Sequence, residues 1–195
     1  MYFMPESIST YGADIDYIWR LVTWFALIWF VVALGAIIFF AIYFRRRNGQ
    51  KAQYIRGIGW KQTRWILVPL ALVFLSDLFI DIETARVWGL VEYQPQKTDL
   101  TVRITGKQWY WAFTYPGPDG KIGTPDDLVV NENTSSELHL PMNKVINLEL
   151  TSVDVLHSFW VKETRLKQDV IPGRVINRWP NVNKPGRYEL ACAEI

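Results

Sequence analysis

The first half of the chain is dominated by two long apolar stretches. Residues 21–44 carry no charge and a single small polar side chain, that of Thr23. At ~1.5 Å per residue, a helix of this length spans a hydrocarbon core about 30 Å thick. A secretory signal peptide starts with basic residues and has a shorter apolar stretch, whereas this N-terminus is acidic. The pattern therefore predicts a transmembrane helix.

The second apolar run covers residues 65–80. It contains Asp77 near its end and is followed by further charged residues. This pattern predicts a second membrane helix whose last turns leave the bilayer. We place the two helices at about 18–44 and 65–88, so that residues 1–90 form an N-terminal tail and a transmembrane helical hairpin.

The connection between the two helices is strongly basic. It carries no Asp or Glu but seven cations, Arg45, Arg46, Arg47, Lys51, Arg56, Lys61 and Arg64. By the positive-inside rule this connection lies in the cytoplasm or in a mitochondrial matrix. The chain after about residue 87 then lies on the opposite face of the membrane. Because the flanking membrane helices explain the cations, they give no support for nucleic-acid binding.

From Asp99 the hydrophobic period changes to two, which is typical of half-buried β-strands. The apolar positions of the two clearest strands are Leu100, Val102, Ile104, Ile146, Leu148 and Leu150. Further short strands are predicted at residues 107–115, 128–131, 137–140, 156–161, 169–177 and 187–191. Short strands separated by Gly and Pro predict that residues 91–195 form an all-β Greek-key sandwich outside the membrane.

Composition limits the classes of function that the β region can have. The single cysteine excludes an intrachain disulfide. From Ala85 onward, 13 Lys and Arg balance 13 Asp and Glu, so a charged partner must be attracted by local patches. The chain has no Ser-His-Asp set, phosphate-binding Gly loop or Cys-x-x-Cys pair, so hydrolase, nucleotide-binding and thiol-redox functions lack support.

A polar loop at residues 116–127 contains Asp119, Asp126 and Asp127. Three carboxylates with Gly turns are one way to hold Ca²⁺, which takes six to eight oxygen ligands. Asp-Gly and Pro-Asp are also common turn formers. The composition favours a plain loop over a Ca²⁺ site.

Two side chains with metal-binding chemistry lie far apart in the β region. His157 stands in a strand-like apolar segment, and Cys192 lies close to Ile195. Imidazole and thiolate are ligands that copper prefers. Taken singly, such a histidine is more often a core residue and such a cysteine a small buried hydrophobe. Further motifs are needed to choose between these interpretations.

The surrounding motifs resemble subunit II of cytochrome c oxidase. They are Asp154-Val155-Leu156-His157-Ser158-Phe159, the stretch 166–174, and Cys192-Ala193-Glu194-Ile195, in the order and spacing of that family. The aromatic run 106–111 and the helical hairpin match as well, so the likeness covers nearly the whole chain. The resemblance implies a cupredoxin-like β domain after the transmembrane hairpin. It further implies a dinuclear copper centre, CuA, which accepts electrons from a cytochrome c or a haem c domain and passes them to haem in subunit I, supporting O₂ reduction and proton pumping.

The same resemblance implies roles for three metal-binding residues. His157 would bind one copper through an imidazole nitrogen, and Cys192 would be one of two bridging thiolates. Glu194 would act twice, with its backbone carbonyl as a weak copper ligand and its carboxylate on Mg²⁺ at the interface with subunit I. The enzyme so implied is a cytochrome c oxidase, in which this chain is not catalytic alone.

The resemblance also implies where the electron donor binds. Trp109 matches the aromatic residue through which the family takes up electrons, and Tyr110 continues the same strand. Asp154 and Asp169 match acidic positions that orient the donor or steady the copper loops. For both aspartates, capping of a turn is the structural alternative.

The sequence departs from the family after Ile195, where the family motif continues with a second Cys, a His and a Met. One thiolate and one imidazole do not build a dinuclear site. Three explanations stay open: a further C-terminal stretch, a copper-free variant, or a mononuclear site. The retention of His157, Cys192 and Glu194 together favours the first. The alternative function is a copper-free structural subunit II of a quinol oxidase.

The expected partners follow from the resemblance. They are subunit I and other oxidase subunits, a cytochrome c or haem c domain, and membrane lipid, with no nucleic acid. The absence of a transit peptide fits a multi-pass protein of a bacterial plasma membrane with its β domain on the periplasmic face. The mitochondrial inner membrane is the alternative, because organelle-encoded subunits also lack a transit peptide.

Overall fold

The computed structural model describes residues 4–46, 49, 51, 54–93, 95, 97–131, 133 and 137–194. Arg47 of the basic connection and Ile195 therefore lie outside the described residues. The chain forms two compact units. One comprises the N-terminal segment up to Ile15 together with the chain from Gly89 onward, and the other is Asp16–Trp88.

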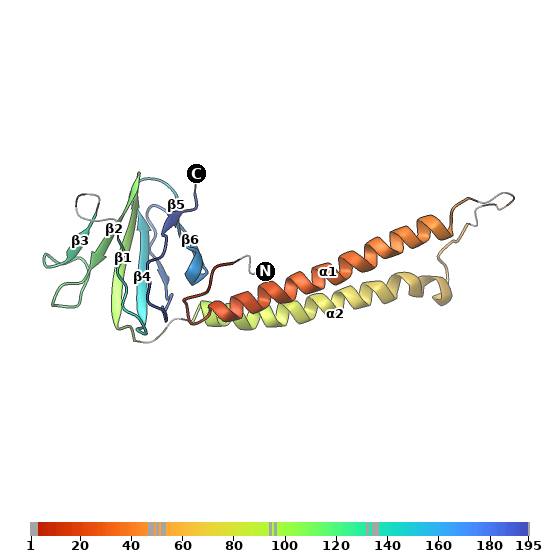
Figure 1. The fold of residues 1–195 in the computed structure, drawn as a ribbon, viewed down its shortest axis with the longest axis horizontal. Helices are drawn as coiled ribbons and strands as arrows, with labels where there is room; N and C mark the ends of the chain where they lie inside the picture. Colours follow the sequence, from red (N-terminus) through yellow and green to blue (C-terminus); the bar gives the residue numbers. More distant parts are fainter. Residues whose placement is uncertain are drawn as a thin grey trace. The chain divides into compact units, whose positions relative to one another are not determined.

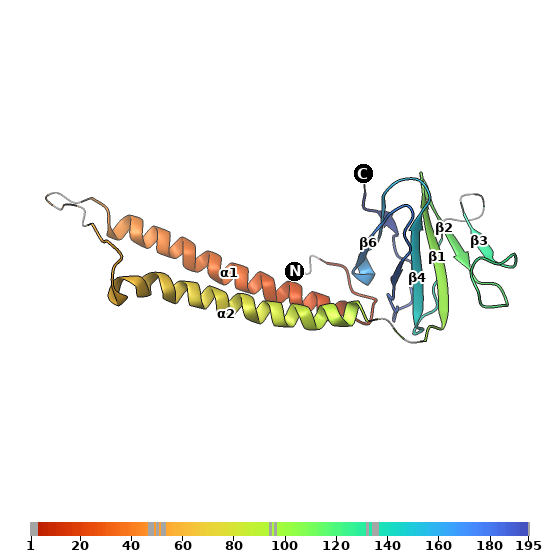
Figure 2. The ribbon, with the colours of Figure 1, turned by 180° about the vertical axis from the view of Figure 1, so that it is seen from behind.

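Two helices of 32 residues each confirm the predicted hairpin, α1 (Gly12–Tyr43) and α2 (Trp60–Val91). They lie side by side in both views (Figures 1 and 2), and the rings of Phe25 and Phe79 approach to 6.2 Å between them. Each is long and apolar enough to cross a membrane. Both helices begin earlier than the apolar runs predict. Only the turns within the hydrocarbon need apolar side chains, so polar turns extend a helix beyond it.

The β domain is the predicted sandwich of two sheets. The larger sheet has the strand order β3-β2-β1-β4-β7 and the smaller β6-β5-β8. The strands are β1 (Leu100–Lys107), β2 (Tyr110–Tyr115), β3 (Leu128–Val130), β4 (Ile146–Ser152), β5 (His157–Val161), β6 (Leu166–Val170), β7 (Ile176–Arg178) and β8 (Ala191–Cys192). A short 3₁₀ helix, η1 (Lys162–Thr164), connects β5 to β6.

The alternating pattern places the core where it was predicted. β1 and β4 pair in parallel, with Val102 opposite Leu148 and Ile104 opposite Leu150, and all four side chains are buried. Each such side chain stabilises the fold by about 1.5–3 kcal/mol relative to an exposed position. Phe159 of the smaller sheet joins the same buried cluster, so the two sheets share one core.

Two predicted strands are divided in the structure. The predicted strand 107–115 is interrupted by a turn at Gln108 and Trp109, across which Lys107 pairs with Tyr110. The predicted strand 169–177 ends as β6 at Val170 and resumes as β7 in the other sheet. Gly173 in the connecting turn has a φ of +76°, a conformation that glycine adopts without steric cost. Period-two patterns do not show where a chain turns back or changes sheet.

The predicted strand 137–140 is wrong, because these residues have no strand pairing. The Tyr115 hydroxyl takes both backbone groups of His139, accepting from its N–H at 2.7 Å and donating to its C=O at 3.1 Å. Leu138 and Leu140 still pack against the core, which accounts for their alternation. Of the predicted strand 187–191, the structure pairs only the last residue, in β8.

The N-terminal segment packs on the β domain, although the sequence placed it with the hairpin. Ile8 is buried in the core, its N–H donates to Glu163 O at 2.9 Å, and its C=O accepts from Asn183 N at 2.8 Å. The Ser9 hydroxyl donates to Thr164 O at 2.8 Å. This segment therefore inserts between η1 and the chain that follows β7.

Candidate metal centre

Several segments meet at one end of the sandwich. The β4–β5 loop is joined to the first hairpin by the bond from Val153 N to Gly106 O at 3.4 Å. Ser152 forms a β-bridge with Pro172 of the β6–β7 turn. Ala193, after β8, donates from its N–H to Ser158 O at 2.9 Å. Figures 1 and 2 show the short segment after β8 at the same end of the sandwich as the tip of β1.

His157 is the first residue of β5 and is 7% exposed. Its ring centroid lies 5.6 Å from that of Trp111. Gly106, the cross-strand partner of Trp111, also lies against the ring, and an added Cβ there would fall 2.7 Å from His157 Cδ2. Gly106 has no positive φ, so the space for the imidazole, and not the backbone conformation, requires glycine there.

The β4–β5 loop supplies a carboxylate that holds the imidazole. His157 Nε2 lies 2.8 Å from Asp154 Oδ1, and Gln108 N donates to Asp154 Oδ2 at 2.7 Å. The Gln108 N–H and, next, His157 lower the pKa of Asp154 well below its usual range. An ionised carboxylate only accepts hydrogen bonds, so Nε2 carries the proton. Nδ1 is then the ring nitrogen left for a metal, the arrangement typical of metal-binding histidines.

Cys192 lies on the strand next to His157. It is directly opposite Phe159 in the antiparallel pair of β5 and β8. Opposed residues point to the same face and faces alternate along a strand, so His157, Phe159 and Cys192 share one face. Cys192 is exposed, and its Sγ lies 3.7 Å from the carbonyl oxygen of Glu194. The imidazole, thiolate and carbonyl of the predicted site thus belong to adjoining strand ends.

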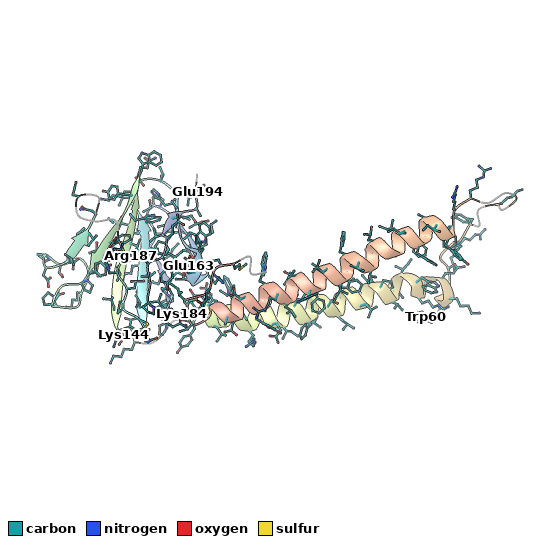
Figure 3. All side chains as sticks on the ribbon, viewed as in Figure 1. Trp60, Lys144, Glu163, Lys184, Arg187 and Glu194 are labelled. Atoms are coloured by element: carbon teal, nitrogen blue, oxygen red, sulfur yellow. The ribbon has the colours of Figure 1, made fainter. Side chains whose placement is uncertain are left out.

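These three groups fit part of a copper site, since copper takes soft thiolate and borderline imidazole ligands. In the described part of the chain, no three His, Cys, Asp or Glu side chains converge to hold a metal ion. A dinuclear centre needs two thiolates, and the single cysteine of the sequence would supply one of them. Glu194 is exposed after β8 and is labelled in Figure 3.

Trp109, the predicted contact with the electron donor, lies at the tip of the hairpin of β1 and β2. Trp109 is 90% exposed in the two-residue turn, and Tyr110 begins β2 with Lys107 Nζ 5.7 Å from its ring centroid. The β4–β5 loop, which is bonded to this hairpin, and the β6–β7 turn, which is bridged to Ser152, expose further apolar side chains, those of Val153, Val155, Leu156, Ile171 and Val175. We call these five residues together with Trp109 the apolar rim.

The two predicted docking carboxylates have internal partners. Asp154 is bonded to His157 and Gln108 as described above, and Asp169 Oδ1 accepts from the Ser158 hydroxyl at 2.7 Å. Both therefore stabilise local structure, which was the alternative for these positions. Donor docking by Asp154, Asp169 and Tyr110 stays a prediction.

The carboxylates of the polar loop stabilise turns. Asp119 Oδ1 accepts from Lys121 N at 2.9 Å, and Asp127 Oδ2 accepts from Gly123 N at 2.7 Å. The Thr124 hydroxyl donates to Asp126 Oδ1 at 2.7 Å and lowers the pKa of Asp126. Three carboxylates bonded in this way favour the plain loop over the Ca²⁺ site.

Sequence reasoning missed three residues around His157. Gly106 could have been found, because an isolated Gly within a strand pattern signals a close approach. Trp111 was recognised as part of the aromatic run but not as the ring beside the imidazole. Gln108 acts through its backbone N–H, so its side chain gives no signal.

An apolar helical hairpin followed by a two-sheet domain, with an imidazole and a thiol on neighbouring strands, defines a membrane-anchored cupredoxin-like protein. The family profile "Cytochrome C oxidase subunit II, periplasmic domain" matches residues 100–195. "Cytochrome c oxidase subunit 2" of Thermostichus vulcanus is 30% identical over 243 residues, which cover 98% of this chain and 70% of the relative. The chain therefore belongs to the cytochrome c oxidase subunit II family.

Two further relatives cover less of the chain. The "Alternative cytochrome c oxidase subunit 2" of Bradyrhizobium diazoefficiens is 40% identical over 114 residues, 48% of this chain and 40% of the relative. A crystal structure of the periplasmic domain of subunit II of cytochrome oxidase from Bradyrhizobium japonicum is 33% identical. It covers 52% of this chain and 77% of that one, with a TM-score of 0.44.

Proposed function

We propose that this chain is the electron-accepting subunit of a haem-copper terminal oxidase. Its β domain receives electrons from a cytochrome c or a haem c domain and delivers them to subunit I, where O₂ is reduced. The chain contributes His157 and Cys192 to a dinuclear copper centre. Copper held by thiolate and imidazole supplies one-electron chemistry with little change of geometry.

One observation carries this proposal: the imidazole of His157 is held in the way expected of a metal ligand. Its Nε2 is held by Asp154 at 2.8 Å, and its ring occupies the space left by Gly106. A histidine that only fills the core needs hydrogen-bond partners. It does not need a carboxylate that fixes Nε2 and leaves Nδ1 for a metal, next to the strand that carries Cys192. The register of Phe159 with Cys192 puts the thiol on the same face.

The apolar rim supports the contact with a donor. Redox partners meet through small, short-lived interfaces, and an exposed aromatic ring gives apolar contact without a large buried area. Trp109 lies in the same turn as Gln108, whose N–H donates to Asp154, the residue that also bonds His157. It therefore offers a route for electron uptake close to the proposed ligand. Tyr110, which follows Trp109 in the chain, and Asp169 are the further residues proposed for this docking.

Glu194 and the two membrane helices would join this chain to the rest of the oxidase. The Glu194 carboxylate is exposed, so it is accessible for Mg²⁺ at an interface with subunit I. The two membrane helices fit a membrane protein that packs with other oxidase subunits in lipid. The basic connection between them supports a β domain on the periplasmic face of a bacterial plasma membrane, or on the outer face of the mitochondrial inner membrane.

Copper analysis of the full-length gene product tests the proposal. We expect about two copper ions per chain and the mixed-valence electron-spin signal of two coppers sharing one unpaired electron. The purified oxidase should also oxidise a reduced c-type cytochrome. Copper-free full-length protein in an oxidase that consumes quinol would instead establish the structural subunit of a quinol oxidase.

A further inference from the structure

The carboxylate of Asp154 joins the proposed metal ligand to the proposed donor contact. We infer that Asp154 is a positioning residue, which fixes the His157 imidazole for copper and at the same time fixes the hairpin that carries Trp109. This inference rests on the proposed function. It differs from the docking role predicted from the sequence, in which Asp154 would attract the donor by its charge.

The contacts of Asp154 point inward. Oδ1 bonds His157 Nε2 at 2.8 Å and accepts from Val155 N at 2.7 Å, while Oδ2 accepts from Gln108 N at 2.7 Å. The side chain is 30% exposed. A carboxylate with both oxygens bonded to its own domain has little acceptor capacity left for a partner.

The loop that carries Asp154 is itself fixed. The Ser152 hydroxyl donates to Val155 O at 2.5 Å, closing the loop between β4 and β5. Val153 N bonds Gly106 O at 3.4 Å, which ties the loop to the first hairpin. Asp154 therefore acts from a braced position, as an orienting residue must if it is to hold a ligand within a few tenths of an ångström.

For His157, the consequence is the choice of ring nitrogen. The bond to Asp154 keeps the proton on Nε2 and orients the ring, which leaves the lone pair of Nδ1 for the metal. Gly106 and its cross-strand partner Trp111 both lie close to the ring and limit its movement. Without Asp154 the imidazole can rotate or exchange tautomers, and the ligand is lost for part of the time.

For the hairpin, the consequence is a fixed turn. Gln108 and Trp109 make up the two-residue turn between Lys107 and Tyr110. The bond from Gln108 N to Asp154 Oδ2 holds this turn against the β4–β5 loop. One carboxylate thus sets both the position of the ligand and the position of the exposed indole, whose backbone is one peptide bond from Gln108.

The test compares Asp154→Ala with Asp169→Asn in the full-length chain in detergent. Asp169 is a matched control, because it is also an aspartate near these loops but bonds the Ser158 hydroxyl and not Gln108 or His157. The first measurement is copper affinity, by competition with a Cu(I) chelator. The second is hydrogen exchange of the segment around Gln108 in copper-free protein, by mass spectrometry.

We expect Asp154→Ala to bind copper about 10–100-fold more weakly than the unaltered protein and to exchange faster around Gln108. Asp169→Asn should match the unaltered protein in both measurements. Asp154→Asn keeps one acceptor oxygen for the three donors at this position, so its copper affinity should fall between these variants.

The inference is overturned if Asp154→Ala keeps the copper affinity and the exchange protection of the unaltered protein and changes only the salt dependence of donor binding. In that case Asp154 docks the donor. The proposed function is tested separately, by the copper content of the unaltered protein. A failure of the proposed function would appear as missing copper in the unaltered protein. A failure of the inference would appear as equal copper affinity and equal hydrogen exchange in Asp154→Ala and the unaltered protein.

Discussion

The imidazole of His157 lies against Gly106, so closely that a Cβ at Gly106 would fall 2.7 Å from His157 Cδ2 and 2.9 Å from Cγ. The neighbouring strand therefore shapes the space for the proposed ligand. This contact leads to the first prediction, because it can be changed by a single methyl group without removing any ligand.

Gly106→Ala should displace His157 and lower copper affinity by about tenfold or more, since added atoms in a packed site force side chains off their positions at a cost of about 1–3 kcal/mol. Copper titration and the electron-spin spectrum measure the effect. Gly89→Ala is the control, because its added Cβ would meet nothing within 4 Å. Unaltered copper affinity in the Gly106→Ala variant would show that the imidazole moves without consequence.

His157→Ala and Cys192→Ser should each abolish the copper spectrum, because each removes a nitrogen or sulfur ligand that copper prefers. Metal analysis and visible absorption of the full-length protein check this outcome. His139→Ala is the matched control, since the His139 side chain is 72% exposed and is not among the proposed ligands. Full metal occupancy in either ligand variant would count against the assignment.

Trp109→Ala should slow electron uptake from the donor by about tenfold or more, corresponding to about 1.4 kcal/mol, with the copper spectrum unchanged. The reason is that the indole is 90% exposed and contributes contact without coordinating metal. Rapid mixing of the assembled oxidase with reduced cytochrome measures the rate. Trp60→Ala removes another exposed indole, at the start of α2 (Figure 3), and should leave this rate unchanged.

Ile8→Ala should destabilise the β domain by about 2–5 kcal/mol, the range for truncating a buried aliphatic side chain. Ile8 is 4% exposed within the core, and its backbone bonds Glu163 and Asn183. Denaturant unfolding of the full-length chain in detergent, followed by tryptophan fluorescence, measures the change. Ile55→Ala, at a position 64% exposed, should be nearly neutral. Equal stability of the two variants would place Ile8 outside the cooperative unit.

The stability of the β domain should fall between about pH 10 and pH 12 through Tyr11. Burial raises the pKa of Tyr11 to about 12, partly offset by the Arg178 charge. In this range the unfolded phenol releases its proton while the folded one keeps it, so rising pH favours unfolding. Tyr11→Phe should therefore reduce the pH dependence of the free energy of unfolding above pH 10. An unchanged slope in this variant would assign the alkaline loss of stability to other groups.

Local patterns predicted much of this fold because they reflect local physics. The uncharged runs specified two helices, since a helix bonds the polar N–H and C=O groups of its own backbone, which find no water in lipid. The alternation at Val102, Ile104, Leu148 and Leu150 specified the inward faces of β1 and β4. The same patterns failed at Gln108 and at the stretch 137–140, where a turn and a side-chain bond from Tyr115 replaced strand pairing.

The sequence by itself determined the membrane hairpin, the sandwich and the side chains proposed to bind metal, because these depend on side-chain chemistry and on hydrophobic periods along the chain. The tertiary structure alone decided what surrounds His157: Gly106 from β1, Trp111 from β2 and Asp154 from the β4–β5 loop. It also decided that the N-terminal segment closes the β domain. Gly106 and Trp111 are distant from His157 in sequence, and strand pairing brings them to the site. Asp154 is only three residues from His157, and the shape of the β4–β5 loop brings its carboxylate to the ring.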